Sequence, residues 1–392
     1  MSCLRLIQID SLAAWRAQAH AWDDLWSRSA VAVPTARAEL IAQWLEEFAP
    51  TCRCCAFVVA EGEKFLAGVM LVATRVKGLL EVGSLLSNDW CTCADLLLDE
   101  QCDSQPVLDL LASALADAPW PLVWLEDVPY QAPRWQALLA AFDRAGLAHS
   151  TQASFPIGQV RLSGNWSDYE AALSGNHRRQ MHKMLRRSQR DGRIELQRYQ
   201  DSSSEHVAEL LRLGFEIEDR SWKATGGTSV LRTPRVFEFL CRQARQLATW
   251  GQLELTFLRL VGQPIAFEFG YRSKQVYFSP KVGFDESFAA YSPGQLLRWE
   301  LLQSLWNEGK TTAVDFWGPL TPATARWANH SYRIGRVVVA PRRLSSRAML
   351  EAYKIGRRGL PILRRQSAPE MVLPALGAAA TCDAIQQPAE PA

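Results

Sequence analysis

Apolar residues in the first half of the chain follow a helical period and then a strand period. From about Ala13 to Phe48 they recur every three or four residues, which predicts a helix with one face toward a core. The positions that carry this period are Leu12, Trp15, Ala19, Trp22 and Trp26. Two apolar runs, AFVVA and KFLAGVMLVATRV, flank a turn at Glu61 and Gly62 and predict a hairpin of strands. A helix from Ser104 to Ala118, a strand at PLVWLED and a helix at PRWQALLAAFDRAG follow.

The second half of the chain repeats this order of elements. A basic helix, HRRQMHKMLRRSQRDG, and a strand, RIELQRY, precede a helix from about Ser204 to Glu218, a loop and another helix. Three strands follow, LELTFLRL, PIAFEFGYR and QVYFSPKVGF, separated by short turns. A helix that stops at Gly309 precedes the strand AVDFWG. The pattern predicts a mixed α/β (α+β) fold of two tandem units, each a mostly antiparallel mixed sheet flanked by helices.

Composition divides the chain into two folded halves and a tail. Its 392 residues, 48% of them hydrophobic and 21% charged, suffice for two buried cores. We expect one domain over residues 1–155, a second over 156–345, a basic helix over 346–366 and a tail over 367–392. The tail is rich in Ala, Pro and Gln without periodicity, so we expect it to be disordered.

The first ten residues and the cysteines indicate the cellular compartment. MSCLRLIQID has no signal-peptide pattern, and no later stretch approaches the roughly 20 apolar residues of a membrane helix. We therefore expect a cytoplasmic protein, with peripheral attachment to the inner membrane as an alternative. The 9 cysteines lie mostly in apolar segments, as reduced thiols do. The C-x-C-C and C-x-C motifs lack the spacing of zinc ligands and have no histidine nearby, so we expect no metal.

The most specific stretch is GQPIAFEFGYRSKQVYFSPKVGFDESFAAYSPGQLLRWELLQSLWNEGKTTAVDFWG, from Gly262 to Gly318. It resembles the CelD-like branch of the GNAT acyltransferase superfamily, which is related to FemAB proteins and associated with cellulose and exopolysaccharide biosynthesis. The motif SWK at 221–223 fits the same branch. The resemblance covers roughly Ser204 to Val339, whereas the first half resembles a diverged GNAT unit without a comparable motif.

This resemblance implies an enzyme, an N-acyltransferase (N-acetyltransferase). It would move an acyl group from acetyl-CoA or a longer acyl-CoA to a small-molecule amine acceptor, such as an amino sugar or another cell-envelope or exopolysaccharide precursor. No metal takes part in such a transfer.

The resemblance places the acyl donor at the start of the helix opened by Pro293. N–H groups at a helix N-terminus, with the helix dipole behind them, bind pyrophosphate. Proline pre-sets the first turn, and Gly294 lets the backbone approach the phosphate. The residues predicted to bind coenzyme A are Val282, Phe284, Tyr291, Ser292, Pro293, Gly294, Gln295 and Leu296. An ordinary capped helix is the alternative, because Ser-Pro is a common helix start.

Glu268 is a carboxylate inside an otherwise apolar strand. Strand alternation places it on the face opposite its apolar neighbours. On the next strand the same alternation gives Tyr277, Ser279 and Lys281 a common face. Glu268 is therefore either the ion-pair partner of Lys281 or a general base whose pKa burial raises toward neutrality.

Further candidates lie in the strand AVDFWG and in the loops. Asp315 faces away from its apolar neighbours and either binds the acceptor amine or caps the segment after it. With Glu268 and Tyr277 it completes the predicted catalytic set. The predicted substrate-binding residues are Trp222, Lys223, Lys281, Trp317 and Arg326. Of these, Trp222 either stacks on a sugar or acyl chain or belongs to a satellite core.

The segment after the last of these strands departs from the family pattern. The family often carries a lysine shortly before an Arg-Trp pair, whereas this chain has Thr324 ahead of Arg326 and Trp327. A non-catalytic partner of a polysaccharide synthase is therefore one alternative function.

The net charge is only +2, so a binding site for an anionic partner must be a local concentration of Lys and Arg. The helix over 178–193 carries Arg178, Arg179, Lys183, Arg186, Arg187, Arg190 and Arg193. This run is either a solvated face or a site for RNA or nucleotide-sugar phosphates. With RNA as partner, the function would be a FemAB-like transferase that uses aminoacyl-tRNA. A second basic stretch, RRLSSRAMLEAYKIGRRGLPILRR, would suit an anionic membrane surface or the polysaccharide-synthesis machinery.

Overall fold

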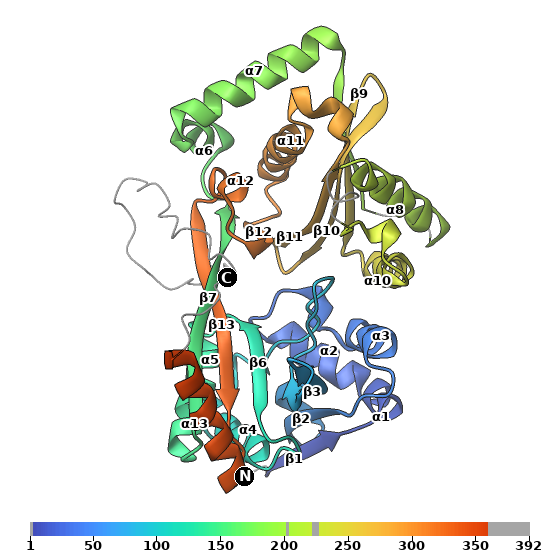
Figure 1. Ribbon diagram of the computed structural model, residues 1–392. Coiled ribbons are helices and arrows are strands. Elements are labelled where there is room, and N and C mark those ends of the chain that lie inside the picture. Colours follow the sequence, from blue (N-terminus) through green and yellow to red (C-terminus); the bar gives the residue numbers. More distant parts are fainter. Residues whose placement is uncertain (1–2, 201–203, 222–226, 360–392) are drawn as a thin grey trace, which may run out of the picture.

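The computed structural model describes residues 3–200, 204–221 and 227–359. Within these residues one continuous mixed sheet extends through the molecule, with helices packed against it (Figure 1). The first half of the chain forms the lower part of the molecule in Figure 1 and most of the second half forms the upper part, but the red end of the described chain returns to the lower part. The predicted mixed α/β fold is therefore confirmed.

The lower half contains five consecutively paired strands and a short accessory strand. These are β1 (Leu4–Ile9), β2 (Cys54–Glu61), β3 (Lys64–Val76), β4 (Leu80–Ser84) and β6 (Val123–Val128), with β5 (Leu97–Leu98) paired to β3. Its helices are α1 (Leu12–Ala17), α2 (Ala19–Arg28), the 3-10 helix η1 (Pro34–Ala36), α3 (Ala38–Phe48), α4 (Ser104–Ala116) and α5 (Pro133–Arg144). Neighbouring strands from β1 to β4 are antiparallel, and β4 and β6, which α4 separates in sequence, are parallel.

The upper half repeats this arrangement. Its strands are β8 (Ile194–Tyr199), β9 (Leu253–Leu260), β10 (Gln263–Ser273), β11 (Val276–Phe284) and β12 (Ala313–Pro319). Its helices are α6 (Trp166–Ala172), α7 (Gly175–Asp191), α8 (Ser204–Asp219), η2 (Val230–Arg232), α10 (Val236–Thr249), η3 (Glu286–Tyr291), α11 (Pro293–Glu308) and α12 (Pro322–Ala325). Strands β8 to β11 pair antiparallel, and β11 pairs parallel with β12 across α11, so the pairing pattern of the lower half recurs.

Two long strands join the halves by a reciprocal exchange. The strand β7 (His149–Arg161) follows the lower unit in sequence but pairs with β12 of the upper unit. The strand β13 (His330–Val339) follows the upper unit but pairs with β6 of the lower one. Since β7 and β13 also pair with each other, the sheet is continuous through the middle of the molecule (Figure 1). The predicted domain boundary at 155/156 lies within β7.

The segment predicted as one helix from Ala13 to Phe48 consists of α1, α2, η1 and α3. Proline has no N–H and its ring obstructs the preceding turn, so the helix cannot continue through Pro34. The indole N–H groups of three tryptophans from α1 and α2 donate to backbone carbonyls of residues 33–38 and so fix α1 and α2 to this segment. Trp15 bonds Ala38, Trp22 bonds Ala36 and Trp26 bonds Val33, at 2.9, 2.9 and 3.1 Å.

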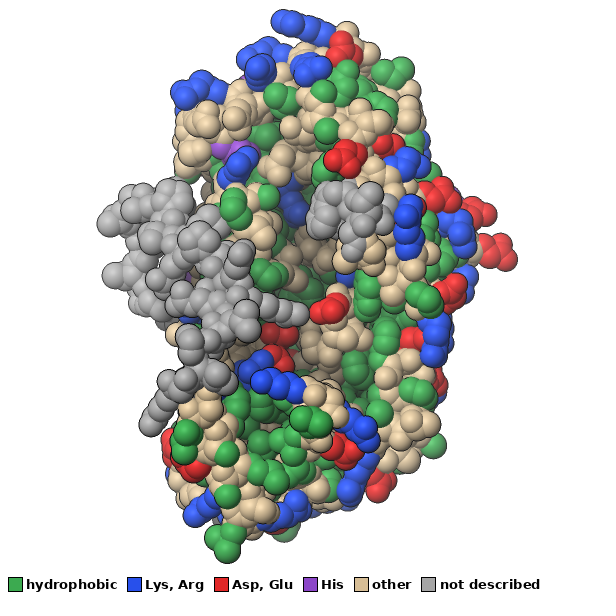
Figure 2. Space-filling model, in the orientation of Figure 1, with side chains coloured by type: hydrophobic (Ala, Val, Ile, Leu, Met, Phe, Trp, Pro, Cys, Tyr) green, Lys and Arg blue, Asp and Glu red, His purple; other side chains and the backbone are tan. Residues whose placement is uncertain are grey.

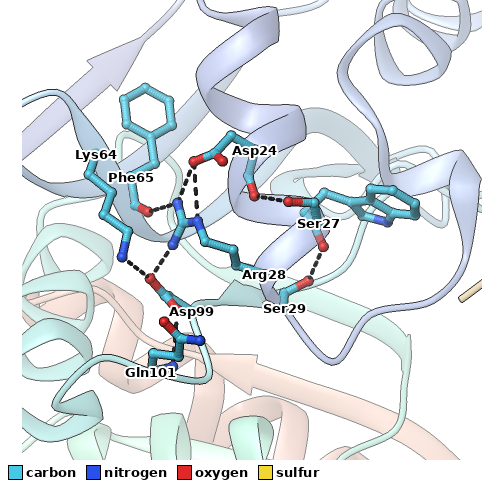
Figure 3. A network of polar contacts seen from close by, with 9 residues as sticks. Asp24, Ser27, Arg28, Ser29, Lys64, Phe65, Asp99 and Gln101 are labelled. Carbon is cyan, nitrogen blue, oxygen red and sulfur yellow. Dashed lines mark hydrogen bonds and ion pairs between the residues drawn. The ribbon is translucent and has the colours of Figure 1, made fainter. Parts of the chain in front are cut away.

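A polar network around the buried Asp99 fixes α2 to the neighbouring strand and loop (Figure 3). Arg28 is ion-paired with the fully buried Asp99 and, at 2.7 Å, with Asp24, and it donates to the carbonyl of Phe65 at 2.9 Å. Lys64 approaches Asp99 to 2.9 Å. Burial raises the pKa of Asp99, but the two cations outweigh it and the pKa lies below its usual value. The negative charge of Asp99 is thus balanced by Arg28 and Lys64 in the folded state.

The last described helix, α13 (Leu344–Gly359), packs against the exchanged strands. It begins two residues before the predicted basic helix at 346, and the remainder of that prediction lies beyond the described residues. Leu350 is buried, and the rings of Tyr353 and Trp124 pack edge to face with their centres 5.2 Å apart. In the part of the chain that the structure describes, no helix is long and apolar enough to cross a membrane.

Candidate active site

The parallel strands β11 and β12 separate in the middle of the upper half. They pair only at Val276 with Ala313, Tyr277 with Val314 and Phe278 with Asp315. Beyond this point β11 continues to Phe284 and β12 to Pro319 without further pairing between the two strands in the described chain. Facing backbone groups that do not pair with each other are available to a ligand that lies between the strands.

A β-bulge lies on β11 where this separation begins. Tyr271 pairs with Phe278 and Phe269 pairs with Lys281, so Ser279 and Pro280 together oppose a single residue of β10. That residue is Gly270, and a Cβ atom there would collide with the Tyr277 hydroxyl. The bulge shifts the alternation by one residue, so Lys281 lies on the face of Phe269 and not on the face of Glu268. The predicted pairing of Glu268 with Lys281 is therefore wrong.

The ion-pair partner of Glu268 is Arg298 of α11. The two side chains approach to 3.1 Å, and both are buried, Glu268 completely. The Arg298 guanidinium also donates to Ser279 Oγ at 2.9 Å and lies 4.8 Å from the centre of the Phe316 ring. Burial raises the pKa of Glu268 above its usual value, and the positive charge of Arg298 opposes that rise.

Tyr277 belongs to the same buried cluster. Its side chain is fully buried, and burial followed by the charge of Glu268 raises its pKa well above the usual value. The structure therefore brings Glu268 and Tyr277 together with Arg298, which the sequence analysis missed. Two signals for it were present. A lone carboxylate in an apolar strand requires a partner, and Arg298 is in helical register with the apolar Leu302 and Leu305.

Asp315 lies on the opposite face of the sheet, at the last position of β12 that pairs with β11. Its carboxylate accepts hydrogen bonds from Gln159 Nε2 at 2.7 Å and from the backbone N–H of Trp317 at 2.8 Å. The Trp317 backbone adopts the left-handed conformation, with φ of +49°. Burial raises the pKa of Asp315 to about 6, although these bonds and one from Tyr332 oppose the rise. The group is thus a carboxylate that exchanges a proton close to neutral pH.

A cavity of about 110 Å³ lies between the two halves on this face of the sheet. Its wall from the lower half is the segment 88–92, and its wall from the upper half comes from α10, β10, β11 and β12. The lining residues are Asn88, Asp89, Trp90, Cys91, Thr92, Leu240, Gln243, Phe269, Tyr271, Pro280, Lys281 and Trp317. The Lys281 ammonium lies 4.8 Å from the Trp90 ring centre.

Two of the predicted substrate-binding residues, Lys281 and Trp317, therefore share this cavity. Arg326 does not line it and lies at the end of α12, where its charge adds to the burial that lowers the pKa of His177 to about 4. Trp222 and Lys223 lie outside the described residues. Pro280 brings the bulge itself to the cavity wall, so the cavity adjoins the point where β11 and β12 separate.

The predicted donor site follows β11 from the bulge to the start of α11. Val282 and Phe284 are half-buried along the strand, and Pro293 opens the helix as expected. Ser292 adopts the left-handed conformation, with φ of +51°, and directs its carbonyl back into the first turn. The N–H groups of Gln295 and Leu296 donate to that carbonyl at 2.9 and 3.1 Å.

The N–H groups of Gln295 and Leu296 are thus engaged within the helix. Their side chains are engaged too, since Gln295 accepts from the Trp327 indole at 2.9 Å and Leu296 is fully buried. Gly294 differs, because its N–H has no hydrogen-bond partner among the described residues. A Cβ atom at Gly294 would make only an ordinary contact, 3.5 Å from Phe284. Packing against the described residues therefore does not require glycine here.

The basic helix α7 lies beside this helix start. Arg187 donates to the carbonyl of Ala290 at 3.1 Å and its guanidinium lies 5.0 Å from the ring of Tyr291. The Tyr291 hydroxyl in turn donates to Asp191 at 2.7 Å. Along the outer side of α7 an exposed row of cations follows the helical repeat, and basic side chains gather at the top of Figure 2, over α7. The row consists of Arg179, Lys183, Arg186 and Arg190.

Comparison with known proteins agrees with this geometry. Residues 175–327 match the model of the family described as acetyltransferase (GNAT) domain. No curated protein matches the chain. Among solved structures, FemX is 11% identical with a TM-score of 0.56, over 85% of this chain and 96% of that chain. A C-terminal domain of a putative lysylphosphatidylglycerol synthetase from Agrobacterium fabrum is 13% identical with a TM-score of 0.52. The match covers 87% of this chain and 97% of that chain.

A Bacteroides thetaiotaomicron protein of unknown function is 10% identical with a TM-score of 0.50, over 87% of this chain and 100% of that chain. At these identities the likeness shows a shared fold. The family match covers α7, the strands β8 to β12 and α11, which carry the bulge, the separated strands and the glycine at the helix start. Residues 175–327 therefore match a GNAT acetyltransferase domain, and this match indicates an acyltransferase.

Proposed function

We propose that this protein is an acyl-CoA-dependent N-acyltransferase of the CelD-like branch. In this proposal the donor lies along β11 with its pyrophosphate at the start of α11, and the amine acceptor enters from the cavity between the halves. The observation that carries the proposal is the bulge at Pro280. It lines the acceptor cavity on one side and leads through Val282 and Phe284 to Gly294 on the other.

The start of α11 suits the anionic part of the donor. A single available N–H at Gly294, the positive end of a 16-residue helix and an open position above the glycine favour a phosphate group. Arg187, anchored to the carbonyl of Ala290, adds positive charge beside it. The thioester end of the donor would then extend toward the bulge.

In this proposal the proton acceptor is Asp315, which does not line the cavity itself but accepts a hydrogen bond from the backbone N–H of Trp317, which does. A neutral amine attacks the thioester carbonyl carbon, the bond between that carbon and sulfur breaks, and coenzyme A leaves as a thiolate, which then takes the amine's proton from Asp315. The proton lost by the amine passes to Asp315, whose pKa of about 6 keeps it mostly ionised at pH 7 but able to accept a proton. Glu268 is less suited to this role, because its carboxylate is buried against Arg298 on the other face of the sheet.

The walls of the cavity support an amino sugar as acceptor. Trp90 and Trp317 offer aromatic faces, on which the apolar face of a sugar ring can stack. Lys281 offers a hydrogen-bond donor to the hydroxyl or carboxylate groups of such a precursor. This class of acceptor also agrees with the resemblance to proteins of exopolysaccharide biosynthesis.

Gly294→Val tests the donor site. We expect the dissociation constant of acetyl-CoA to rise at least about tenfold, equivalent to about 1.4 kcal/mol, because the side chain would occupy the phosphate position. The melting temperature should change little, since the nearest atom to a Cβ there is 3.5 Å away. Gly175→Val is a matched control at the start of α7, where a Cβ would lie 3.6 Å from Arg179. Equal acetyl-CoA affinity in the two variants would contradict the donor site.

The exposed row on α7 supports a second candidate, a transferase that uses aminoacyl-tRNA. Four cations on one side of a helix beside the candidate site are suited to a phosphate backbone. This candidate predicts that Arg186→Glu with Arg190→Glu weakens tRNA binding at least about tenfold. The matched control, Arg75→Glu with Lys77→Glu, makes the same change of charge at exposed positions of the lower half.

We expect both double variants and the unaltered protein to retain aminoacyl-tRNA equally in a filter-binding assay at 150 mM salt, about the physiological ionic strength. That result removes the tRNA candidate. A loss specific to the α7 variant would instead favour it over the acyl-CoA proposal.

A further inference from the structure

Two thiols meet in the wall of the cavity between the halves. Cys91 Sγ lies 3.2 Å from Cys93 Sγ. Their spacing explains the contact, because residues i and i+2 of an extended segment project to the same side. Thr92 between them is fixed by its bridge to Ser87 and by the Thr35 hydroxyl, which donates to its carbonyl at 2.6 Å. The two sulfurs therefore face each other on an anchored segment.

One side chain of the opposite half contacts both sulfurs. Cys91 Sγ donates to Gln243 Oε1 at 3.5 Å, and Gln243 Nε2 donates to Cys93 Sγ at 3.5 Å. Gln243 is itself buried on α10. The amide thus holds the thiols in one arrangement from across the cavity. The two thiols differ in access, since Cys91 lines the cavity and is half-buried, whereas Cys93 is fully buried behind it.

The environment of Cys91 also differs from that of the other buried cysteines. The hydrogen bond from Cys93, the bond with Gln243 and the charge of Lys281 lower the pKa of the Cys91 thiol against the effect of burial. Burial raises the pKa of Cys55 and of Cys241 to about 11. Because the thiolate is the reactive form, Cys91 is the most reactive of these three thiols.

We propose that Cys91 and Cys93 are a peroxide-sensitive thiol pair that closes reversibly to a disulfide in the cavity wall. The Cys91 thiolate attacks one oxygen of hydrogen peroxide, the O–O bond breaks, and after protonation water leaves and Cys91 becomes a sulfenic acid. The Cys93 thiol then attacks the Cys91 sulfur, and the sulfenic oxygen leaves as a second water. In sum, two thiols and one peroxide give one disulfide and two waters, and a thiol reductant restores the pair.

Hydrogen peroxide is small enough for a cavity of about 110 Å³, and the two sulfurs that would join already lie 3.2 Å apart. The inference stands apart from acyl transfer, because it concerns the thiols alone and is measured without a donor or an acceptor.

The test treats the full-length protein with hydrogen peroxide and maps the peptides by mass spectrometry, alongside a count of titratable thiols. We expect two fewer thiols and a disulfide between Cys91 and Cys93, both reversed by a thiol reductant. In Cys93→Ser the partner is lost, so Cys91 should advance to the sulfinic acid, which the reductant does not restore. Cys54→Ser is the matched control, since it removes one of two adjacent buried cysteines and should leave the 91–93 disulfide unchanged.

Two results would overturn the proposal. In one, Cys91 and Cys93 stay reduced while Cys54, Cys55 or Cys241 is oxidised. In the other, Cys91 of the unaltered protein reaches the sulfinic acid as fast as it does in Cys93→Ser. The first reading comes from the unaltered protein alone, so it remains decisive if a variant folds poorly.

Discussion

Asp315→Asn is expected to lower kcat/KM by about 10²- to 10⁴-fold at pH 7 while leaving the melting temperature unchanged or higher. The substitution keeps the shape of the side chain and its bond with Trp317, but it removes the group that would accept the amine proton. Activity is measured as release of the coenzyme A thiol with acetyl-CoA and a panel of amino sugars. Acetyl-CoA affinity serves as the control, and it should not change.

The stability part of this expectation follows from the raised pKa. In the unfolded chain the Asp315 carboxyl titrates near 3.8, and in the folded protein at about 6. The stabilising contribution of the protonated form is therefore complete below pH 4 and is lost as the pH rises through 6. At pH 7 the ionised Asp315 carboxylate lowers the free energy of unfolding by on the order of 3 kcal/mol. The neutral amide of Asp315→Asn has no such effect. A lower melting temperature together with a proportionate loss of activity would assign Asp315 a structural role.

The same pKa predicts the acid side of the pH profile. Because the ionised form is the base, kcat/KM of the unaltered protein should rise with pH and level off above about pH 6. In Asp315→Asn that inflection should disappear. An unchanged inflection in the variant would assign it to another group.

Arg298→Met is expected to lower the free energy of unfolding at pH 7 by about 3 to 5 kcal/mol, because it leaves Glu268 as a buried carboxylate without its cation. Urea denaturation measures this loss. The pKa of Glu268 is already raised by burial, so the variant should regain stability as the pH falls and the carboxyl is protonated. The double variant Glu268→Gln with Arg298→Met should recover much of the loss at pH 7.

Lys281→Met is the matched control for this ion pair. It removes a cation from the adjacent strand, but from the opposite face of the sheet, and its effect on stability should be small. A loss in Lys281→Met equal to that in Arg298→Met would contradict the assignment of Arg298 as the partner. If Glu268→Gln alone remains stable but loses turnover, the base is Glu268 and not Asp315.

The sequence predicted most elements of the fold, because its signals there are local. The alternation along β9 to β11, the Ser-Pro start of α11 and its end at Gly309 each depend on a few neighbouring residues. The repeat of two units followed from the same order of elements in both halves. The exchange of β7 and β13 was not predictable in this way, since alternation identifies a strand but not the strand it pairs with.

The candidate site was predictable only in part, for a related reason. Pro280 marks the bulge on β11, and one extra residue there moved Lys281 from the face of Glu268 to the cavity. The Ser292 carbonyl accepts the N–H of Gln295, which a helix start was expected to leave available. Such effects depend on a single backbone conformation, which residue spacing does not reveal.

In the proposed function the donor is an acyl-CoA bound at the start of α11. Calorimetric titration of the full-length protein with acetyl-CoA, with longer acyl-CoA thioesters and with aminoacyl-tRNA tests it most directly. We expect saturable binding of one acyl-CoA per chain and no competition by aminoacyl-tRNA. Binding of aminoacyl-tRNA without binding of any acyl-CoA would contradict it.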